Sequence, residues 1–384
     1  MTKKYHKKTI LQVVPALVSG GVERGTIEIA RKLQESGYNP VVVSAGGPLV
    51  NKLSVRDIPH IKLNVASKNP VVIWNNAKLI ANIIKEYKVD LIQARSRAPA
   101  WSCYMAAKAT NKKFMTTFHG IYNISGPLKK YYNSIMTKGE KIIAVSNFVK
   151  EYILRNYETN EDKINVVHRG VDHTYFNQAS LSSEQLLKFK EKYNVCHGIP
   201  VILLPSRMTE WKGHMVLIEA LNKIKHLDFR CLIVGDLSKH PNFTTRVQQR
   251  LTELKLHGKI QIFGHELDML ELYGISDLIL SPSIEPEAFG RTIIEGQSME
   301  KLVIATNIGG AAETIIDQVS GFHVKTKDVN DLSEKISYCL SILGKEESKV
   351  ITTNARKSVI DKFSLDHMLN RTLQIYDELL SKID

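Results

Sequence analysis

The segment 281–295 holds the densest group of residues in this sequence that could do chemistry. It contains two carboxylates, Glu287 and Glu295, separated by seven residues. We expect the first in a loop after a β-strand and the second about two turns into the following helix. Residues 289–291 fall where that helix begins, and the free N–H groups of a helix N-terminus can hold a phosphate. One loop and one helix could therefore present carboxylates to sugar hydroxyls and amides to a diphosphate.

Two cationic residues, Arg207 and Lys212, follow another predicted strand, 200–205. Ligands of open α/β sheets bind at the carboxyl ends of strands. Arginine offers a planar fork of donors and lysine a compact charge, so both could reach a diphosphate. Ordinary loop charges are the alternative interpretation of these two residues.

The first half of the chain carries a weaker phosphate signal in Gly20 and Gly21, between predicted strand 9–14 and predicted helix 23–35. Two glycines let a backbone approach a ligand closely, although such a pair is often only a turn. The segment lacks the full Gly-x-Gly-x-x-Gly pattern and the acidic residue that should follow it, which argues against NAD binding.

Three further side chains of the first half could meet a substrate. Arg95 and Arg97 lie at a predicted strand end that opens a helix, where they could bind an anionic acceptor or form a charged loop. His119 follows predicted strand 113–118, and a lone histidine in such a place is often a core residue.

These residues need elements that position them, and short apolar runs alternate with helical patterns throughout the chain. Such alternation predicts two parallel sheets covered by helices, which meet within 171–200. The expected strands are 9–14, 40–45, 60–64, 90–94, 113–118, 141–145 and 165–167, then 200–205, 229–234, 260–263, 278–281, 302–305 and 322–324. The expected helices include 23–35, 72–87, 147–156, 216–224, 245–256, 331–343 and 365–383.

Composition sets broad limits on the protein's class. A length of 384 residues with 43% hydrophobic and 24% charged residues indicates a globular protein of two domains. No apolar stretch is long enough to span a bilayer, and the basic start followed by 10–18 predicts a strand rather than a secretory signal. The four cysteines are far apart and show no metal-ligand or disulfide pattern, which favours a cytoplasmic protein.

Charge is unevenly distributed along the chain. Residues 1–172 hold 27 Lys and Arg against 12 Asp and Glu, a net +15, whereas 173–384 hold 25 against 27, a net −2. A basic first half suggests an anionic partner such as membrane headgroups, an acidic lipid-linked acceptor or nucleic acid, or simply a lysine-rich surface. No nucleic-acid module or aromatic interleaving is present, so we expect no nucleic-acid partner.

Several of these motifs together resemble a known family. The run from Pro286 to Thr292 with Glu295 is followed by strand 302–306, a Gly309-Gly310 turn and the expected start of a helix that contains Glu313. This succession resembles the retaining family called glycosyl transferases group 1. The pair Arg207 and Lys212 is similar to that family's donor-phosphate motif. Gly20-Gly21 is similar to its N-terminal loop, and the segment 117–120 to its acceptor-side histidine segment.

The resemblance implies a GT-B fold, an α/β architecture of two Rossmann-like, doubly wound parallel-sheet domains facing across a cleft. It implies an acceptor-binding domain over 1–175, a nucleotide-sugar-binding domain over 176–364, and a helix over 365–384 that crosses back to the first domain. The expected catalytic residues are Arg207, Lys212, Glu287 and His119. The expected donor-binding residues are Gly20, Gly21, Phe289, Gly290, Arg291 and Glu295, and Arg95 and Arg97 are candidates for the acceptor.

The activity implied is transfer of a hexose from a UDP- or GDP-sugar to a saccharide or glycolipid acceptor, with lipopolysaccharide as the favoured pathway. No cofactor or metal ion is expected, and the sequence contains no Asp-x-Asp pair. The protein would be cytoplasmic, with an anionic membrane surface as a candidate partner. The alternatives are a glycoside hydrolase using the two glutamates, a nucleotide-sugar epimerase, and a basic nucleic-acid-binding protein.

Overall fold

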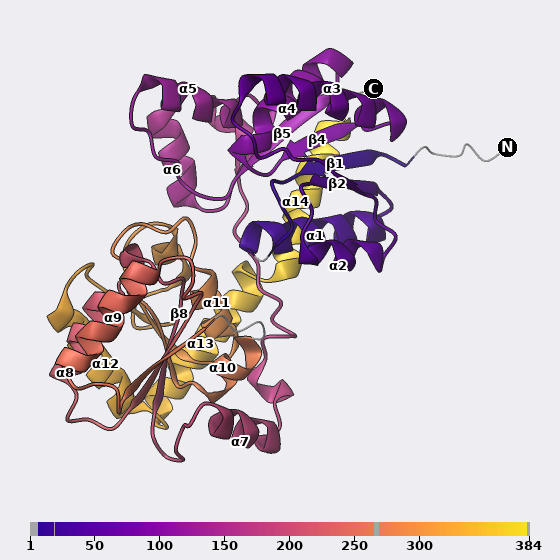
Figure 1. Ribbon diagram of the computed structural model, residues 1–384. Coiled ribbons are helices and arrows are strands. Elements are labelled where there is room, and N and C mark those ends of the chain that lie inside the picture. Colours follow the sequence, from indigo (N-terminus) through magenta and orange to yellow (C-terminus); the bar gives the residue numbers. More distant parts are fainter. Residues whose placement is uncertain (1–6, 19, 265–268, 382–384) are drawn as a thin grey trace. The chain divides into compact units, whose positions relative to one another are not determined.

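The computed structural model describes residues 7–18, 20–264 and 269–381, which form two compact units (Figure 1). Unit 1 comprises Met1–His168 together with Met368–Asp384, and unit 2 comprises Arg169–His367. Each unit is built around one sheet in which every strand pairing is parallel. The expected pair of Rossmann-like domains is therefore confirmed.

Unit 1 contains a seven-stranded sheet in the order β3-β2-β1-β4-β5-β6-β7. The order reverses between β1 and β4, which is where ligands bind in open sheets of this kind. Its strands are β1 (Thr9–Val13), β2 (Asn39–Ser44), β3 (His60–Lys62), β4 (Leu91–Ala94), β5 (Lys113–Phe118), β6 (Lys141–Ala144) and β7 (Ile164–Val166). Its helices are α1 (Gly21–Glu35), α2 (Asn51–Ser54), α3 (Pro70–Glu86), α4 (Arg97–Thr110), α5 (Pro127–Ser134) and α6 (Asn147–Asn156), with short 3-10 turns η1 (Pro48–Val50), η2 (Ile135–Thr137) and η3 (Glu161–Lys163).

Unit 2 contains a six-stranded sheet in the order β10-β9-β8-β11-β12-β13, which reverses between β8 and β11. Its strands are β8 (Val201–Pro205), β9 (Arg230–Val234), β10 (Ile260–Phe263), β11 (Leu278–Ser281), β12 (Leu302–Thr306) and β13 (Phe322–Val324). Its helices are α7 (Ser183–Lys192), α8 (His214–Lys223), α9 (Pro241–Glu253), α10 (Met269–Ile275), α11 (Arg291–Ser298), α12 (Val329–Ile342) and α13 (Glu346–Lys362), with turns η4 (Gln178–Ser180), η5 (Glu210–Lys212) and η6 (Gly310–Thr314).

The core of unit 2 shows why its strands are almost wholly apolar. Ile202 and Leu204 of β8 face the layer of α8, α9 and α12, as do alternate residues of the neighbouring strands. Leu203, which lies between them, is also fully buried. Figure 1 shows α8, α9 and α12 on one side of β8 and α10, α11 and α13 on the other. Because both faces are covered, the central strands β8, β9, β11 and β12 are nearly continuous hydrophobic runs rather than alternating ones.

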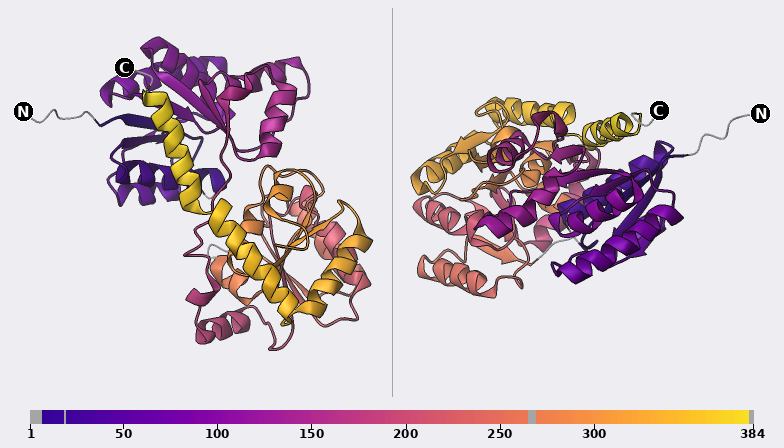
Figure 2. Two further views of the ribbon diagram at one scale, coloured as in Figure 1. Left: turned by 180° about the vertical axis from the view of Figure 1, so that it is seen from behind. Right: turned by 90° about the horizontal axis from the view of Figure 1, so that it is seen from above.

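The last helix, α14 (Leu365–Leu380), begins in unit 2, and from Met368 onward it belongs to unit 1 (Figure 2). Its Tyr376 is fully buried and donates a hydrogen bond of 2.5 Å to Gln93 Oε1 on β4. Near its end, Glu378 forms an ion pair of 3.5 Å with Lys141 at the start of β6. Polar contacts from the helix therefore reach two strands of the sheet.

Two expectations need correction. The segment after Gly309 was predicted to start a helix, but it forms only the five-residue 3-10 turn η6. Helix α13 was not predicted, because its apolar residues are few and widely spaced.

None of the described helices is long and apolar enough to cross a membrane. All four cysteines are free, with Cys196 exposed and the others buried.

Candidate functional site

The two groups expected to do chemistry in the second half meet as an ion pair. Lys212 Nζ lies 2.6 Å from Glu287 Oε1, and the two side chains are only 12% and 11% exposed. Lys212 ends the turn η5 after β8, and Glu287 lies in the loop after β11. These strands are neighbours at the point where the strand order of unit 2 reverses. The pair therefore occupies the position at which open α/β sheets bind ligands.

A glycine brings the Lys212 loop against the loop after β11. Gly213 has φ +77°, and a Cβ at this position would lie 1.9 Å from the carbonyl oxygen of Pro282. The approach continues two residues along each loop, where the Ile284 N–H donates a hydrogen bond of 2.7 Å to the Trp211 carbonyl. Only glycine combines this backbone conformation with this contact, so the loop geometry that places Lys212 depends on it.

Glu287 is held at both its side chain and its backbone. The hydroxyl of Ser283 donates to Glu287 Oε1, and the hydroxyl of Ser281 lies 3.4 Å from the same oxygen. The Glu287 carbonyl accepts a hydrogen bond of 2.7 Å from the Gly310 N–H. Gly309 has φ +66°, and a Cβ there would lie 2.6 Å from the Glu287 carbonyl oxygen. The glycine pair expected to start a helix thus supports the Glu287 loop.

Helix α11 begins directly beyond this loop. Its N-cap residue, Gly290, provides no side-chain cap, so the N–H groups of Arg291 and Thr292 have no intrahelical acceptor and can serve a ligand. Phe289 is buried and packs edge-on against Phe363, with ring centroids 5.8 Å apart. This contact fixes the chain just before the helix. The geometry suits an anion placed at the helix N-terminus.

The second glutamate, Glu295, lies on α11 and is engaged on both of its oxygens. Arg291 donates to Oε1 at 3.1 Å, and the Tyr273 hydroxyl donates to Oε2 at 2.9 Å. Burial, together with the nearby carboxylate, raises the pKa of Tyr273 well above its usual value, so this hydroxyl stays a donor. Tyr273 was not predicted from sequence, since a buried tyrosine on a short helix gives no pattern. Arg291 therefore forms an ion pair with Glu295 on the same helix and orients its carboxylate.

Burial controls the electrostatics around Lys212. It lowers the pKa of the Lys212 ammonium, while the Glu287 carboxylate acts in the opposite direction. Burial also lowers the pKa of His214 to about 4, so His214 is neutral at pH 7. The neutral ring lies 3.1 Å from the Ser206 hydroxyl and packs behind the loop. The positive charge of this region therefore comes from Lys212 and Arg207.

Arg207 lies on the same loop but does not join the buried pair. Its side chain is exposed, and its guanidinium carbon lies 5.5 Å from the centroid of the Trp211 ring. Within the described residues it forms no ion pair. The structure therefore brings together Lys212 and Glu287 and leaves Arg207 as an uncompensated cation beside them.

The candidates of the first half lie at the carboxyl edge of the sheet in unit 1. Gly20 and Gly21 follow β1 and open α1, Arg95 and Arg97 follow β4, and His119 follows β5. These three strands are adjacent, in the order β1-β4-β5. The topology therefore gathers the predicted residues on one side of unit 1.

Arg95 differs from what its position in the sequence suggests. It is 1% exposed, and its Nη1 lies 3.4 Å from Gln93 Oε1. Burial lowers its pKa. In this conformation Arg95 cannot touch an acceptor, because its side chain is enclosed by the core. Arg97 remains partly exposed, with its guanidinium 4.7 Å from the Tyr122 ring centroid and a hydrogen bond of 2.9 Å to Asn133.

Family models match both units of the chain. Residues 19–175 match the model described as Glycosyltransferase Family 4, and residues 187–358 match Glycosyl transferases group 1. A crystal structure of a glycosyltransferase from Rickettsia africae is 61% identical, with a TM-score of 0.92, and the match covers 98% of this chain and 99% of that one.

More distant proteins are also similar to this chain. The crystal structure of Anabaena Alr3699/HepE in complex with UDP is 22% identical, with a TM-score of 0.84, and the match covers 97% of this chain and all of that one. The Campylobacter jejuni N,N'-diacetylbacillosaminyl-diphospho-undecaprenol alpha-1,3-N-acetylgalactosaminyltransferase is 24% identical, over 83% of this chain and 85% of its own length.

Proposed function

Because the chain belongs to the group 1 glycosyltransferases, we propose that it moves a hexose from a UDP- or GDP-sugar to an envelope glycan or a lipid-linked acceptor, with retention of anomeric configuration. The observation that carries the proposal is the buried Lys212–Glu287 pair, which lies one loop away from the uncapped N-terminus of α11. Cation, carboxylate and helix amides are the three groups that a diphosphate-linked sugar requires.

In the proposed reaction the bond between the anomeric carbon and the diphosphate oxygen breaks, and the leaving diphosphate gains negative charge. Lys212, Arg207 and the first amides of α11 stabilise that charge. Preorganised groups of this kind usually make the largest contribution to catalysis. The close contact of Gly213 with Pro282 fixes the end of the loop that carries both residues.

The sugar would be held by Glu287, whose oxygens accept hydrogen bonds from sugar hydroxyls once the diphosphate has taken over Lys212. Glu295, supported by Arg291 and Tyr273, would accept from the ribose hydroxyls. The acceptor oxygen attacks the anomeric carbon on the face that the diphosphate leaves, and its proton passes to the departing phosphate oxygen. This route conserves configuration without a covalent enzyme intermediate, and no metal ion takes part.

The acceptor would approach from unit 1, where Arg97 and His119 lie at the carboxyl edge of the sheet. A lipid-linked acceptor is supported by the name of the Campylobacter jejuni relative, which acts on a diphospho-undecaprenol. The net charge of +15 over residues 1–172, from 27 basic and 12 acidic residues, fits an acceptor that carries phosphate or lies in an anionic membrane. A place in lipopolysaccharide assembly is our favoured pathway.

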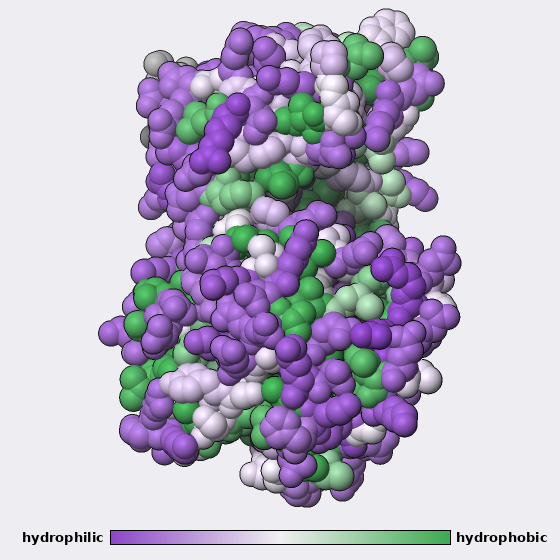
Figure 3. Space-filling view, turned by 90° about the vertical axis from the view of Figure 1, so that its left-hand side faces the viewer, coloured by the Kyte–Doolittle hydropathy of each residue, from purple (hydrophilic) through white to green (hydrophobic). Residues whose placement is uncertain are grey.

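We also propose that unit 1 contacts the inner face of the cytoplasmic membrane through α5. This helix exposes Leu128 (85%) and Tyr131 (67%) next to Lys129 and Lys130. Apolar side chains flanked by lysines suit an anionic bilayer surface. Figure 3 views the side on which α5 lies in Figure 1, where hydrophilic residues cover most of the surface and hydrophobic ones form small separate groups. A local contact is therefore expected rather than a broad apolar face.

A thermal-shift screen against UDP-, GDP- and ADP-sugars tests the proposed function, because a ligand that binds the folded state raises the apparent melting temperature. We expect one class of nucleotide sugar to raise it, and expect release of the matching nucleoside diphosphate only when an acceptor is added. If no nucleotide sugar shifts the melting temperature, the proposal is wrong. Isomerised donor in the absence of acceptor would indicate an epimerase instead.

A further inference from the structure

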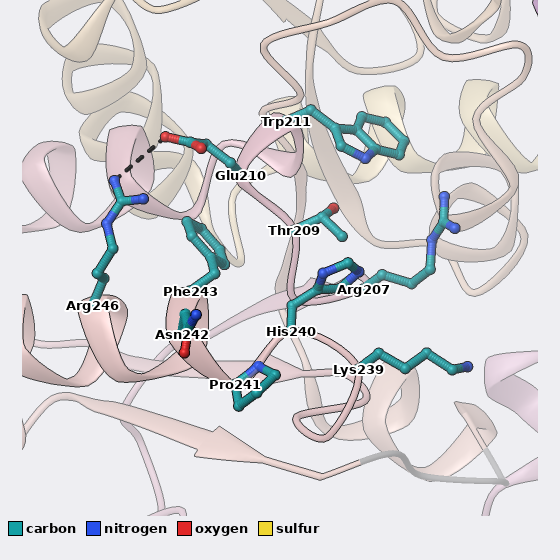
Figure 4. Close-up of a pocket in the computed structure, with 10 residues that line it drawn as sticks. All are labelled: Arg207, Thr209, Glu210, Trp211, Lys239, His240, Pro241, Asn242, Phe243 and Arg246. Atoms are coloured by element: carbon teal, nitrogen blue, oxygen red, sulfur yellow. Dashed lines mark hydrogen bonds and ion pairs between the residues drawn. The ribbon is translucent and has the colours of Figure 1, made fainter.

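A cavity of about 620 Å³ lies between the turn η5 and the first turn of α9 (Figure 4). Its size falls within the usual range of small-molecule sites. The loop after β8 forms one wall, with Arg207, Thr209 and Trp211. The N-terminal part of α9 and the residues before it form the other wall, with His240, Phe243 and Arg246.

The charge of the cavity is positive. Arg207, Lys239 and Arg246 line it against one acid, Glu210, which leaves a formal charge of +2. Two of the cations are partly neutralised, since Arg246 lies 3.4 Å from Glu210 and Lys239 lies 3.2 Å from Asp236. Arg207 has no ion pair among the described residues. An anion could therefore gain a strong partner there without breaking an existing pair.

A buried hydroxyl adds an independent sign of a ligand. Thr209 is only 9% exposed, yet its Oγ1 has no hydrogen-bond partner in the described part of the chain. Figure 4 shows its side chain between Trp211 and His240. Burying a hydroxyl without a hydrogen-bond partner is unfavourable, because its contacts with water are lost and not replaced. A ligand in the cavity would remove that cost once the Thr209 side chain rotates its hydroxyl toward the cavity.

The second wall supplies further donors and apolar surface. Helix α9 is thirteen residues long, and its N-cap residue His240 provides no side-chain cap. Its first residue, Pro241, has no N–H, so the amides of Asn242 and Phe243 are the ones without intrahelical acceptors. The rings of Phe243 and Trp211 line the same space. The site thus combines an arginine fork, a hydroxyl and helix amides, which bind phosphate, with aromatic faces that could pack against a sugar or base.

We propose that this cavity binds a phosphorylated small molecule of nucleotide or sugar-phosphate size, as a second site distinct from the one that takes the donor's diphosphate. The two sites lie on opposite sides of β8. Lys212 reaches toward β11 and pairs with Glu287, whereas Thr209 faces residues that follow β9. Arg207 borders the cavity and, if the proposed function is right, also contacts the donor, so occupancy of one site should affect the other.

Calorimetric titration of pyrophosphate into the full chain tests this inference. The wild-type chain should show two binding events. Lys212→Ala should remove the event at the donor site. The double change Thr209→Val with Arg246→Ala should weaken the event at the cavity by about tenfold or more, because hydrogen bonds to the bound anion are lost. Glu210→Gln should strengthen that second event, because it removes the only acid in the lining and frees Arg246.

Arg250→Ala is the matched control, since Arg250 lies on the same helix, pairs with Glu219 and Glu253, and does not line the cavity. It should leave both events unchanged. A single binding event abolished by Lys212→Ala would mean that the cavity belongs to the donor site, and would overturn the inference. So would an unchanged titration of the Thr209 and Arg246 variant. This outcome can be distinguished from failure of the proposed function. If only the proposed function is wrong, no glycosyl transfer would be detected, but pyrophosphate would still bind the cavity.

Discussion

Lys212 and Glu287 are 75 positions apart in the sequence, yet their side chains meet at 2.6 Å in a buried ion pair. Without a substrate, each group compensates the charge of the other. Removing one partner of a buried pair leaves an uncompensated charge, which is more harmful than losing an exposed pair. The diphosphate of a donor would replace Glu287 as the partner of Lys212 and release the carboxylate for the sugar. Under the proposed function, the pair would be a preformed site for a ligand that carries both a diphosphate and hydroxyls.

The pH dependence of turnover should follow the ionisation of Lys212. Burial lowers its pKa and the Glu287 carboxylate raises it, and the proposed mechanism needs the protonated form. As pH rises through this pKa, the ammonium loses its proton, so activity should fall on the alkaline side. Glu287→Gln removes the negative charge that raises the pKa of Lys212. The alkaline limb of the kcat/KM profile should therefore move to lower pH.

A pH series of kcat/KM for wild type and Glu287→Gln measures this effect. Glu285→Gln is the control, because Glu285 lies in the same loop but forms no ion pair among the described residues, and it should leave the limb in place. An alkaline limb that does not move in Glu287→Gln would contradict the coupling between the two residues.

Gly213→Ala should destabilise unit 2 far more than a glycine substitution of the same backbone conformation elsewhere. Gly213 and Gly198 have φ +77° and +78°, but a Cβ at Gly213 would lie 1.9 Å from Pro282, whereas nothing lies within 4 Å at Gly198. Gly198→Ala should therefore cost only about 1–2 kcal/mol of backbone strain. Gly213→Ala should cost a further 1–3 kcal/mol or so from overpacking. Denaturant unfolding of both variants measures the difference, and equal losses would show that the contact does not matter.

Tyr376→Phe should weaken the attachment of α14 to unit 1. The change removes the hydrogen bond of 2.5 Å to Gln93, a side chain that is fully buried. We expect a loss of about 1–3 kcal/mol in the free energy of unfolding. Tyr38→Phe is the comparison, because the Tyr38 hydroxyl also bonds to α14, through Asp377, but at the surface. Equal effects of the two changes on denaturant unfolding would argue against an anchoring role for the buried bond.

The double change Lys129→Glu and Lys130→Glu should reduce binding to anionic vesicles. Each lysine near such a surface contributes about 1 kcal/mol, so reversing two charges should abolish most of the binding. Co-sedimentation with vesicles of phosphatidylglycerol and phosphatidylcholine measures it, with pure phosphatidylcholine as the reference. Lys85→Glu with Lys88→Glu, which makes the same charge change near the end of α3, should bind nearly as wild type does. Equal losses in both variants would mean that net charge, rather than α5, determines membrane binding.

Most of the fold could be predicted from the sequence, because strands buried on both faces are continuous apolar runs with clear ends. Strands β5, β10, β11 and β13 have the predicted bounds, and the other strand ends differ by one or two residues. Helix α13 was missed because its exposed face dominates its composition. The contacts of α14 depend on tertiary packing that no local pattern encodes.

The candidate site was predictable in its members but not in its contacts. Arg207, Lys212, Glu287 and Glu295 were identified from their positions after strands and near a helix start. The ion pair itself could not be foreseen, because it joins two loops brought together by the sheet order and by Gly213. Arg95 was expected at the surface, because an arginine at a strand end usually is, yet the core encloses it. Tyr273, Ser281 and Ser283 support the two glutamates without any sequence signal.

Steady-state release of nucleoside diphosphate by Lys212→Ala, in the presence of donor and acceptor, tests the central claim most directly. Loss of one preorganised charge at the leaving group should lower kcat by about 10²–10³-fold. Circular dichroism should show an intact fold, and Lys223→Ala, an exposed lysine on α8, should keep wild-type turnover. Near-normal kcat in a folded Lys212→Ala protein would contradict the account.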